Sequence, residues 1–408
     1  MLTSTDSPFG AYTGHATRTR PLVVFAHKGH DWIRGSEQCL LDLVSGLDRE
    51  AFRLMLLTNG RTLAAEVERR GVEAVLVKHW SGGAVTNLFT HQRVTRLLRE
   101  RGASLVHANM AVTLPLVIPA ARRLGIPVLT HLHMPFASLA ARHGALVRQS
   151  TLTVGVADHV VAPLRAGTAG SGRVRVVENA VNVERLASGD ARRLRASLGI
   201  RADAFVATSV GSLIARKGQS AAIRAVAHAR AQGLDVHLLL CGDGPDEPAL
   251  RALATALGAD QAVHLLGMRR DVGAILRDAT DVLVATAHEE AQPLSVLEAQ
   301  WSGVPVLASD IVAHRDAMPP ASGGALFPLD DAEALARELR ALAVAPARRR
   351  EMAIAGQRFA HGRYDMRRYV AAFTALYEDL LAPAAHRRSG ARERVSTLSG
   401  GHAVLRTR

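Results

Sequence analysis

The sequence predicts an α/β protein built of two doubly wound domains, and three observations support this prediction. The chain has 408 residues, which suffices for two domains that each bury a core. Short apolar segments of strand length alternate along it with segments whose apolar residues recur at helical spacing. The strand-like segments are apolar almost throughout, which is typical of a parallel sheet with helices on both faces.

The first half begins at PLVVFAH (21–27), an apolar run of strand length that follows a small, polar N-terminal segment. The next segment, SEQCLLDLVSGL, carries its apolar residues at helical spacing. The same alternation then repeats: strand-like FRLMLLT, helical AAEVERRG, strand-like EAVLVKH, helical VTRLLRERG, strand-like SLVHAN, helical LPLVIPAARRLG and strand-like PVLTHLH. The segments HVVAP and RVRVVENAV follow, and then NVERLASGDARRLRASLGI, which we expect to be polar and helical.

The second half repeats the alternation from FVATSVG onwards. We therefore predict a flexible tail over 1–20, a first Rossmann-like domain over 21–188 and a second over 189–365. The helix MRRYVAAFTALYEDLLA lies in a segment, 366–385, that we expect to return to the first domain, and 386–408 reads as a basic disordered tail. In such a fold, ligands lie beyond the carboxyl ends of the strands, in a cleft between the domains.

Composition favours a soluble cytoplasmic protein. No stretch approaches twenty apolar residues, so no membrane span is expected. The first twenty residues lack the apolar run of a secretory signal. The two cysteines, Cys39 and Cys241, lie far apart in apolar segments and read as buried thiols in a reducing compartment.

The net charge of +13 is compatible with nucleic acid, an anionic membrane surface or acidic substrates as partners. Ordinary solvation of helix faces by arginine explains the charge equally well. Aromatic residues make up only 4% of the chain and no nucleic-acid-binding motif appears, which disfavours nucleic acid. Peripheral binding to the inner face of a membrane stays open.

Several segments occur in an order and at strand–helix junctions that resemble the family 4 retaining glycosyltransferases, over about residues 21–380. They are RGSEQCLLDL, HLHM, RVVENAVNVERL, VGSLIARKG, LLLCGDGPDEPAL, VHLLGMRRDVGAIL and HEEAQPLSVLEAQWSGVPVLASD. The resemblance implies the GT-B fold, in which two Rossmann-like domains face a central cleft. The first domain would bind the acceptor and the second the nucleotide-sugar donor.

The last of these segments contains two glutamates separated by seven residues. Glu290 should lie in the loop after a strand, and Glu298 about one turn into the following helix. The start of that helix, at Leu294 and Ser295, offers unpaired N–H groups and a positive dipole end to a diphosphate. The resemblance implies that Glu298 accepts the ribose hydroxyls and that Glu290 stands near the donor sugar. The family's Gly-Phe-Gly is replaced by Ala291-Gln292-Pro293, so we expect a reshaped sugar pocket.

Three further segments of the second half carry donor-site residues, as the resemblance implies. In GSLIARKG, the resemblance makes Lys217 the cation beside the departing β-phosphate and Gly211 part of the same site. The family's Arg after this glycine is Ser212 here, and Arg216 is a candidate to compensate. The remaining donor-site residues are the turn glycines Gly242 and Gly244, and Met268 and Arg269, whose backbone would lie beside the base.

The first domain contributes Gly35, the second glycine of a Gly-Gly turn whose first position is Arg34 in this chain. Backbone amides of such a turn can approach a phosphate or the acceptor. His133 matches a family histidine that hydrogen-bonds the donor sugar or meets developing charge. We expect His131 to point to the opposite face of its strand and to be structural. The histidines and acidic residues suggest no metal-ligand set, so neither a metal nor another cofactor is predicted.

The resemblance thus implies a hexosyltransferase-like, metal-independent enzyme that moves a sugar from a UDP- or GDP-sugar to an acceptor hydroxyl with retention. Cell-envelope glycans, polysaccharides, glycolipids and small metabolites are all compatible acceptors, with contacts expected in the loops SGGAVTNLFTHQR and MPFASLAARHG. Two alternatives are a sugar-nucleotide epimerase on the same fold and a catalytically degenerate binding scaffold. An oxidoreductase is disfavoured because neither half shows G-x-G-x-x-G after its first strand.

Overall fold

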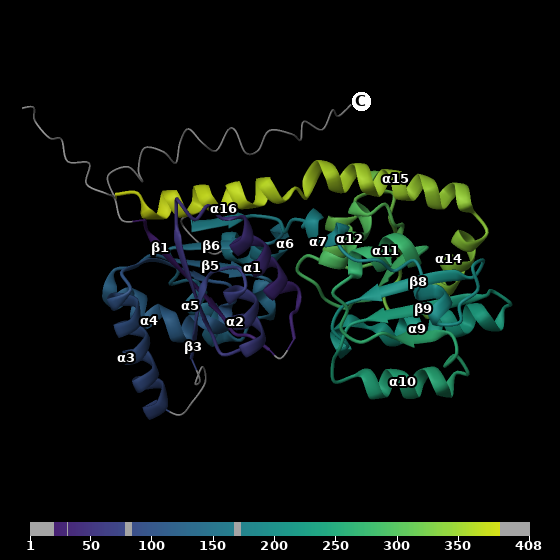
Figure 1. The fold of residues 1–408 in the computed structure, drawn as a ribbon, viewed down its shortest axis with the longest axis horizontal. Coiled ribbons are helices and arrows are strands. Elements are labelled where there is room, and N and C mark those ends of the chain that lie inside the picture. The colour runs from purple at the N-terminus through teal and green to yellow at the C-terminus, as the bar shows by residue number, and fades with distance from the viewer. Residues whose placement is uncertain (1–19, 31, 78–83, 167–172, 384–408) are drawn as a thin grey trace, which may run out of the picture.

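The computed structural model describes residues 20–30, 32–77, 84–166 and 173–383. Two parallel sheets, each covered by helices, lie side by side in it (Figure 1). The predicted N-terminal and C-terminal tails fall almost entirely outside the described residues. No helix of the described part combines the length and apolar character needed to cross a membrane.

The first sheet has seven strands in the order β3-β2-β1-β4-β5-β6-β7. Its strands are β1 (Leu22–His27), β2 (Arg53–Thr58), β3 (Glu73–Leu76), β4 (Ala103–Ala108), β5 (Val128–Leu132), β6 (Leu152–Gly155) and β7 (Val174–Val176). Its helices are α1 (Gly35–Gly46), α2 (Arg61–Glu68), α3 (Ala84–Glu100), α4 (Leu114–Leu124), α5 (Ala141–Val147) and α6 (Asp158–Ala166).

The second sheet has six strands in the order β10-β9-β8-β11-β12-β13. Its strands are β8 (Phe205–Val210), β9 (Val236–Cys241), β10 (Val263–Leu265), β11 (Val282–Ala285), β12 (Val306–Ser309) and β13 (Ala325–Phe327). Short helices α7 (Val183–Ala187) and α8 (Leu194–Ser197) precede it. The helices that follow are α9 (Gln219–Ala231), α10 (Glu247–Ala256), α11 (Val272–Ala279), α12 (Leu294–Trp301), α13 (Val312–Ala317), α14 (Ala332–Ala343), α15 (Pro346–Arg363) and α16 (Met366–Leu381).

The period of two along a strand explains how each sheet buries both faces. In β1, Val24 and Ala26 belong to one core cluster, while Val23 and Phe25 belong to the cluster on the opposite face. Because both faces of the strand are buried, its residues Leu22 to Ala26 are all apolar. The last residue, His27, is also buried, and its ring nitrogen Nδ1 has a hydrogen-bond partner in Asn109. The uninterrupted apolar run in the sequence is the signature of this arrangement.

Three segments differ from the sequence prediction. HVVAP lies in α6, and the strand before it, β6, has no counterpart among the predicted strands. The polar segment 182–200 forms only the short helices α7 and α8, since Gly189 takes a φ of +89° between them. Residues 84–93, expected to be an acceptor-binding loop, are the first part of helix α3.

Helices α15 and α16 run one after the other along the same side of both sheets (Figure 1). α16 packs against α1 and β4 of the first sheet, with Tyr369, Phe373 and Tyr377 buried in that sheet's core. Gly46 of α1 permits the contact, because a Cβ there would lie 2.5 Å from Val370 Cγ2. The C-terminal part of the chain therefore joins the two halves covalently and by packing.

Two buried tyrosines of α16 give a matched test of this packing. The Tyr377 hydroxyl lies 2.6 Å from His107 Nδ1, whereas the buried Tyr369 hydroxyl has no hydrogen-bond partner among the described residues. Tyr377→Phe leaves a buried imidazole nitrogen unpaired and should lower the free energy of unfolding by about 1–3 kcal/mol. Tyr369→Phe should leave it unchanged or raise it. Urea unfolding of both variants measures the difference, and equal losses would contradict this account.

Candidate active site

A cavity of about 490 Å³ lies between the two sheets. Each sheet reverses its strand order once, between β1 and β4 in the first and between β8 and β11 in the second. Residues that follow these four strands line the cavity, among them Arg34, Met110, Gly211 and Glu290. The cavity thus lies where ligands of doubly wound sheets bind, at the carboxyl ends of the strands beside the point of reversal.

All the predicted site residues except Gly244 line this cavity: Gly35, His133, Gly211, Arg216, Lys217, Gly242, Met268, Arg269, Glu290, Leu294, Ser295 and Glu298. Gly244 instead packs on the loop after β8, where a Cβ would lie 2.1 Å from the Leu213 carbonyl oxygen. Its small size permits this close contact between two loops. Gly242 lines the cavity and is also required to be small, since a Cβ there would lie 2.0 Å from the Gly211 carbonyl oxygen.

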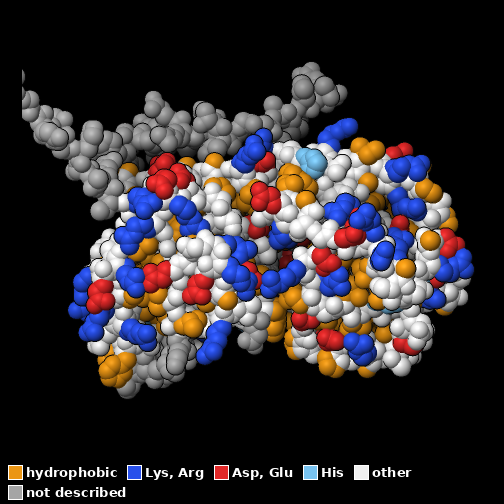
Figure 2. Space-filling view, in the orientation of Figure 1, with side chains coloured by type: hydrophobic (Ala, Val, Ile, Leu, Met, Phe, Trp, Pro, Cys, Tyr) orange, Lys and Arg blue, Asp and Glu red, His pale blue; other side chains and the backbone are white. Residues whose placement is uncertain are grey.

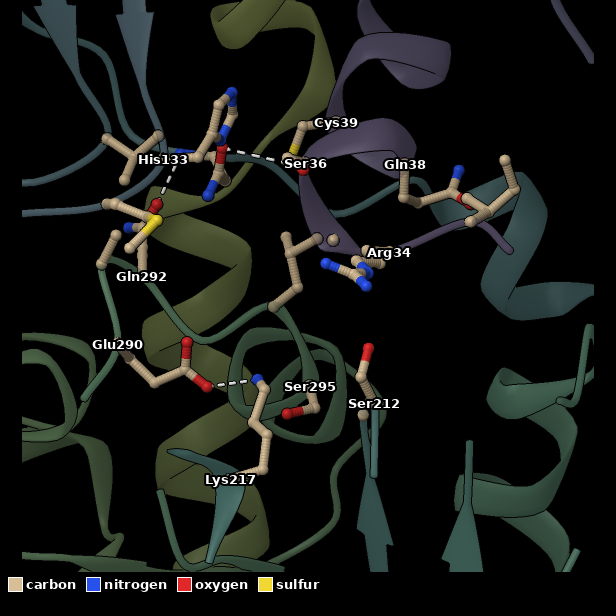
Figure 3. A pocket seen from close by; sticks show the side chains of 18 of the residues that line it. Arg34, Ser36, Gln38, Cys39, His133, Ser212, Lys217, Glu290, Gln292 and Ser295 are labelled. Carbon is tan, nitrogen blue, oxygen red and sulfur yellow. Dashed lines mark hydrogen bonds and ion pairs between the residues drawn. The ribbon is translucent and has the colours of Figure 1, made fainter. Parts of the chain in front are cut away.

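Two cations of the second domain converge on Glu290. Lys217 Nζ donates to Glu290 Oε1, and Arg216 Nη1 lies 3.2 Å from Oε2 (Figure 3). Burial acts to raise the pKa of Glu290, but the charges of Lys217 and Arg216 outweigh it and hold that pKa below its ordinary value. Glu290 is therefore an ion-paired carboxylate at neutral pH. Arg216 also donates to the Glu289 carbonyl, so, like Lys217, it is held in place beside Glu290.

Glu298 is part of a buried cluster that sequence reasoning missed. Arg185 Nη2 of α7 donates to Glu298 Oε1 over 2.6 Å and lies 3.6 Å from Asp42 Oδ2 of α1. Asp42 also accepts from Asn182 and Gln38 over 2.8 and 2.9 Å. The two carboxylates raise the pKa of Arg185 against the effect of its burial. Arg185 lies within the segment RVVENAVNVERL, one of those that carry the family resemblance. No pattern in the sequence, however, pairs Arg185 with Glu298, which is 113 residues away.

His133 is held by a chain of buried polar groups. Asn109 Nδ2 donates to the Ser36 carbonyl and to His27 Nδ1, over 3.1 and 2.9 Å. This fixes the orientation of the amide, so Asn109 Oδ1 faces His133 Nε2 at 3.3 Å and that nitrogen carries the proton. His133 Nδ1 is left as a hydrogen-bond acceptor. Beyond His27, Glu37 Oε1 lies 3.2 Å from His27 Nε2.

Burial and the neighbouring His27 lower the pKa of His133 to about 3, with Glu37 acting weakly in the opposite sense. The imidazole is consequently neutral at physiological pH. The predicted orientation of His131 was wrong: its ring centroid lies 4.1 Å from that of His133, on the same side of the strand. Residues i and i+2 of a strand share a face, which is why the two rings lie against each other, with their planes at 49°.

The loop that departs from the family pattern bridges the two domains. Gln292 Oε1 accepts from the Asn179 backbone N–H over 2.6 Å, and Ala291 is buried in a core cluster of the first sheet. Pro293 is the N-cap of α12, with φ −79° and ψ 95°. Each of the three residues thus has a structural role: Ala291 fills a core, Gln292 accepts a hydrogen bond and Pro293 begins a helix. An aromatic residue at position 292 would lack the hydrogen bond to Asn179.

The starts of two helices lie close together at the cavity. A Cβ on Gly35, the first residue of α1, would lie 3.6 Å from Leu294 Cδ1, the first residue of α12. The first N–H groups of a helix have no partner within it, and the helix dipole places partial positive charge there. The arrangement suits an anion between α1 and α12. No group of three or more His, Cys, Asp or Glu that could hold a metal occurs in the described ranges.

Comparison with known proteins agrees with this architecture. Residues 190–359 match the family described as "Glycosyl transferases group 1", and residues 33–185 match the one described as "Glycosyltransferase Family 4". The lipopolysaccharide core biosynthesis glycosyltransferase LpsE of Rhizobium meliloti is 32% identical over 209 residues, 51% of this chain and 58% of the relative. A D-inositol 3-phosphate glycosyltransferase of Saccharomonospora viridis is 31% identical over 220 residues, 51% of each chain. The chain spans only about half the length of these relatives.

Solved structures show the same fold. Anabaena Alr3699/HepE in complex with UDP and glucose superposes with a TM-score of 0.78 at 20% identity, over 88% of this chain and 99% of that one. WaaG, a glycosyltransferase involved in lipopolysaccharide biosynthesis, gives 0.69 at 18% identity, over 87% and 99%. The predicted GT-B fold is thereby confirmed. The chain belongs to the group 1 glycosyltransferases, with a family 4-like N-terminal half.

Proposed function

We propose that the chain is a retaining glycosyltransferase that moves a sugar from a UDP- or GDP-sugar to an acceptor hydroxyl. The observation that carries this proposal is the position of the Lys217–Glu290 pair in the cavity that Leu294 and Ser295, at the start of α12, also line. A cation and unpaired N–H groups then meet in one water-restricted space. This is the environment that a nucleoside diphosphate leaving group requires.

In the proposed reaction the bond between the sugar C1 and the β-phosphate oxygen breaks while C1 bonds to the acceptor oxygen. Negative charge develops on the departing phosphate, where Lys217 Nζ and the N–H groups of α12 stabilise it. A phosphate oxygen takes the acceptor proton on the same face of the sugar, which gives retention. Glu290 holds Lys217 in place, and because it is ion-paired it is a poor candidate for a covalent nucleophile.

His133 is proposed to accept a hydrogen bond from a hydroxyl of the donor sugar through Nδ1. The other ring nitrogen, Nε2, donates to Asn109 Oδ1. Because the pKa of His133 is low, the imidazole is neutral, so it orients the sugar without contributing charge. Glu298 is proposed to receive the ribose hydroxyls, with Met268 and Arg269 beside the base, since all three line one end of the same cavity. The cations of the chain suffice for the diphosphate, so neither a metal nor a further cofactor is part of the proposal.

The acceptor is proposed to be a cell-envelope glycan, polysaccharide or glycolipid, in keeping with relatives named for lipopolysaccharide core biosynthesis. We place the reaction in the cytoplasm, at the inner face of an anionic membrane. The support for that surface is the basic segment of the first domain around α5, where Arg148 lies 5.1 Å over the ring of Phe136 and Arg142 adds a second charge.

Thermal unfolding with UDP, GDP and ADP tests the donor site. A nucleotide at about 100 times its Kd should add about 2.7 kcal/mol to the free energy of unfolding. We expect one of the three to stabilise the wild type and Glu298→Ala to remove that effect. Glu333→Ala on the exposed face of α14 is the control and should keep it. Absence of stabilisation by all three nucleotides in the folded wild type would refute the proposal.

A further inference from the structure

We propose that Arg34 binds the diphosphate of the donor and is the cation that the first domain supplies to this site. The inference rests on the proposed function, which it extends by assigning a charge to the phosphate subsite. It follows from the pairing of the cations in the cavity, from the placement of Arg34 between two helix starts and from the residue on the opposite wall.

The other lysine and arginine side chains that line the cavity are each paired with a carboxylate. Lys217 and Arg216 share Glu290, and Arg185 pairs with Glu298. Arg269 makes a bidentate pair with Asp271, with its Nε and Nη2 2.8 and 2.6 Å from the two carboxylate oxygens. Within the described part of the chain Arg34 has no carboxylate partner, and its buried Nε has no hydrogen-bond partner. A guanidinium left unpaired in a cavity is available to an anionic ligand.

The side chain of Arg34 is nevertheless held in place. Its guanidinium carbon lies 4.9 Å from the centre of the Trp32 ring, a cation–π contact that leaves its N–H groups unused. Its backbone N–H donates to Glu37 Oε2 over 3.3 Å, which fixes the start of α1. In Figure 3 the guanidinium projects from the start of α1 into the cavity, on the side from which Ser212, Ser295 and Lys217 face it.

The surroundings of Arg34 favour a phosphate ligand. Arg34 is the N-cap of α1, and the next residue, Gly35, faces Leu294 at the start of α12. A diphosphate placed between these two helix starts would meet N–H groups from both domains together with Lys217. The planar guanidinium of Arg34 can then bind two phosphate oxygens at once, which a lysine cannot do. Lys and Arg side chains of both lobes also border the seam between them in Figure 2.

The two walls of the cavity differ in charge at positions 212 and 34. Position 212 on the second-domain wall is a short, uncharged serine, and position 34 on the first-domain wall is an arginine. A diphosphate would then connect the two domains directly, so that its binding favours the closed form.

The test is to measure the Kd of UDP, GDP and ADP, and of the parent nucleosides, for the wild type and for Arg34→Ala. We expect Arg34→Ala to weaken binding of the preferred nucleoside diphosphate about tenfold or more and binding of its nucleoside less than about twofold. The double variant Arg34→Ala/Ser212→Arg should regain most of the lost affinity. Arg123→Ala, which removes the same charge from an exposed position of α4, should bind like the wild type.

The outcomes separate this inference from the proposed function. If the wild type binds a nucleoside diphosphate and Arg34→Ala binds it equally well, the inference is wrong while the function stands. Equal weakening for diphosphate and nucleoside would also overturn the phosphate assignment. A wild type that binds no nucleotide would overturn both. Arg34→Gln, which keeps a polar side chain but removes the charge, gives the same test if the alanine variant does not fold.

Discussion

Replacing Lys217 with alanine is expected to lower kcat for sugar transfer by about 10²–10³-fold at saturating donor. Its ammonium group lies where charge develops on the leaving phosphate, so its contribution is larger in the transition state than in the ground state. The loss should therefore appear mainly in kcat, with a smaller effect on KM. Steady-state release of nucleoside diphosphate, with donor and acceptor both saturating, measures this effect.

Lys28 provides the control for this prediction, because it is a partly exposed lysine that does not line the cavity. Lys28→Ala should retain wild-type kcat. Lys217→Arg should retain more activity than Lys217→Ala, since the positive charge opposite Glu290 is kept although its shape differs. A Lys217→Ala variant with unchanged kcat would remove the basis of the proposed electrostatic stabilisation.

The stability of the fold is expected to fall steeply below pH 6.5 because of the buried histidines His107 and His131 and the half-buried His133. Burial lowers the pKa of His107 and His133 to about 3 and that of His131 well below its ordinary value. The unfolded chain, in which these groups titrate near 6.5, therefore binds more protons than the folded chain below that pH. Their contribution is complete above pH 6.5 and is lost at up to about 1.4 kcal/mol per pH unit for each histidine.

Together the three imidazoles remove about 4 kcal/mol per pH unit, which is large against the 5–15 kcal/mol that stabilises a typical domain. Urea midpoints should be constant between pH 8 and 7 and fall continuously from pH 6.5 to 5. Glu37 and Glu290, whose pKa values are lowered, add to the loss only when the pH falls below about 4.5. Midpoints that stay level from pH 8 to 5 would contradict this assignment.

His131→Leu isolates one of the three contributions. Both ring nitrogens of His131 are buried without a partner in the described chain, and its neighbours include the aromatic ring of Phe373. An apolar side chain of similar size should leave stability at pH 7.5 unchanged or raise it. The pH dependence should become shallower by about 1.4 kcal/mol per unit. His361→Leu, on the exposed surface of α15, should leave the pH dependence unchanged.

The sequence predicts the fold well where local pattern and tertiary role agree. The apolar run of β1 and the helical spacing in α1 predict the ends of both elements to within about two residues of their positions in the structure. The pattern is weaker for β6, a strand of four residues, and for the segment 182–200, where polar helical composition yields only short turns. The start of helix α3 was expected to be a loop because the resemblance places acceptor contacts in loops of the first domain, although Val85, Leu88 and Phe89 recur at helical spacing.

The sequence locates candidate site residues that are tied to a strand end, but it misses contacts with partners far away in the chain. Glu290, Lys217 and Glu298 could be placed because each follows a recognisable strand. The pairing of Arg185 with Glu298, and of Asn109 with His133 and His27, depends on contacts between elements that are far apart in the chain. Local sequence carries no record of that geometry, and for the same reason it cannot show that Arg216 is already engaged by Glu290.

The most direct test of the central claim is a crystal structure with the nucleoside diphosphate that stabilises the chain. The account predicts the β-phosphate between Lys217 and the start of α12, with the ribose on Glu298. A nucleotide bound outside the cavity, or with its phosphates directed away from Lys217, would contradict the proposed donor site and the mechanism built on it.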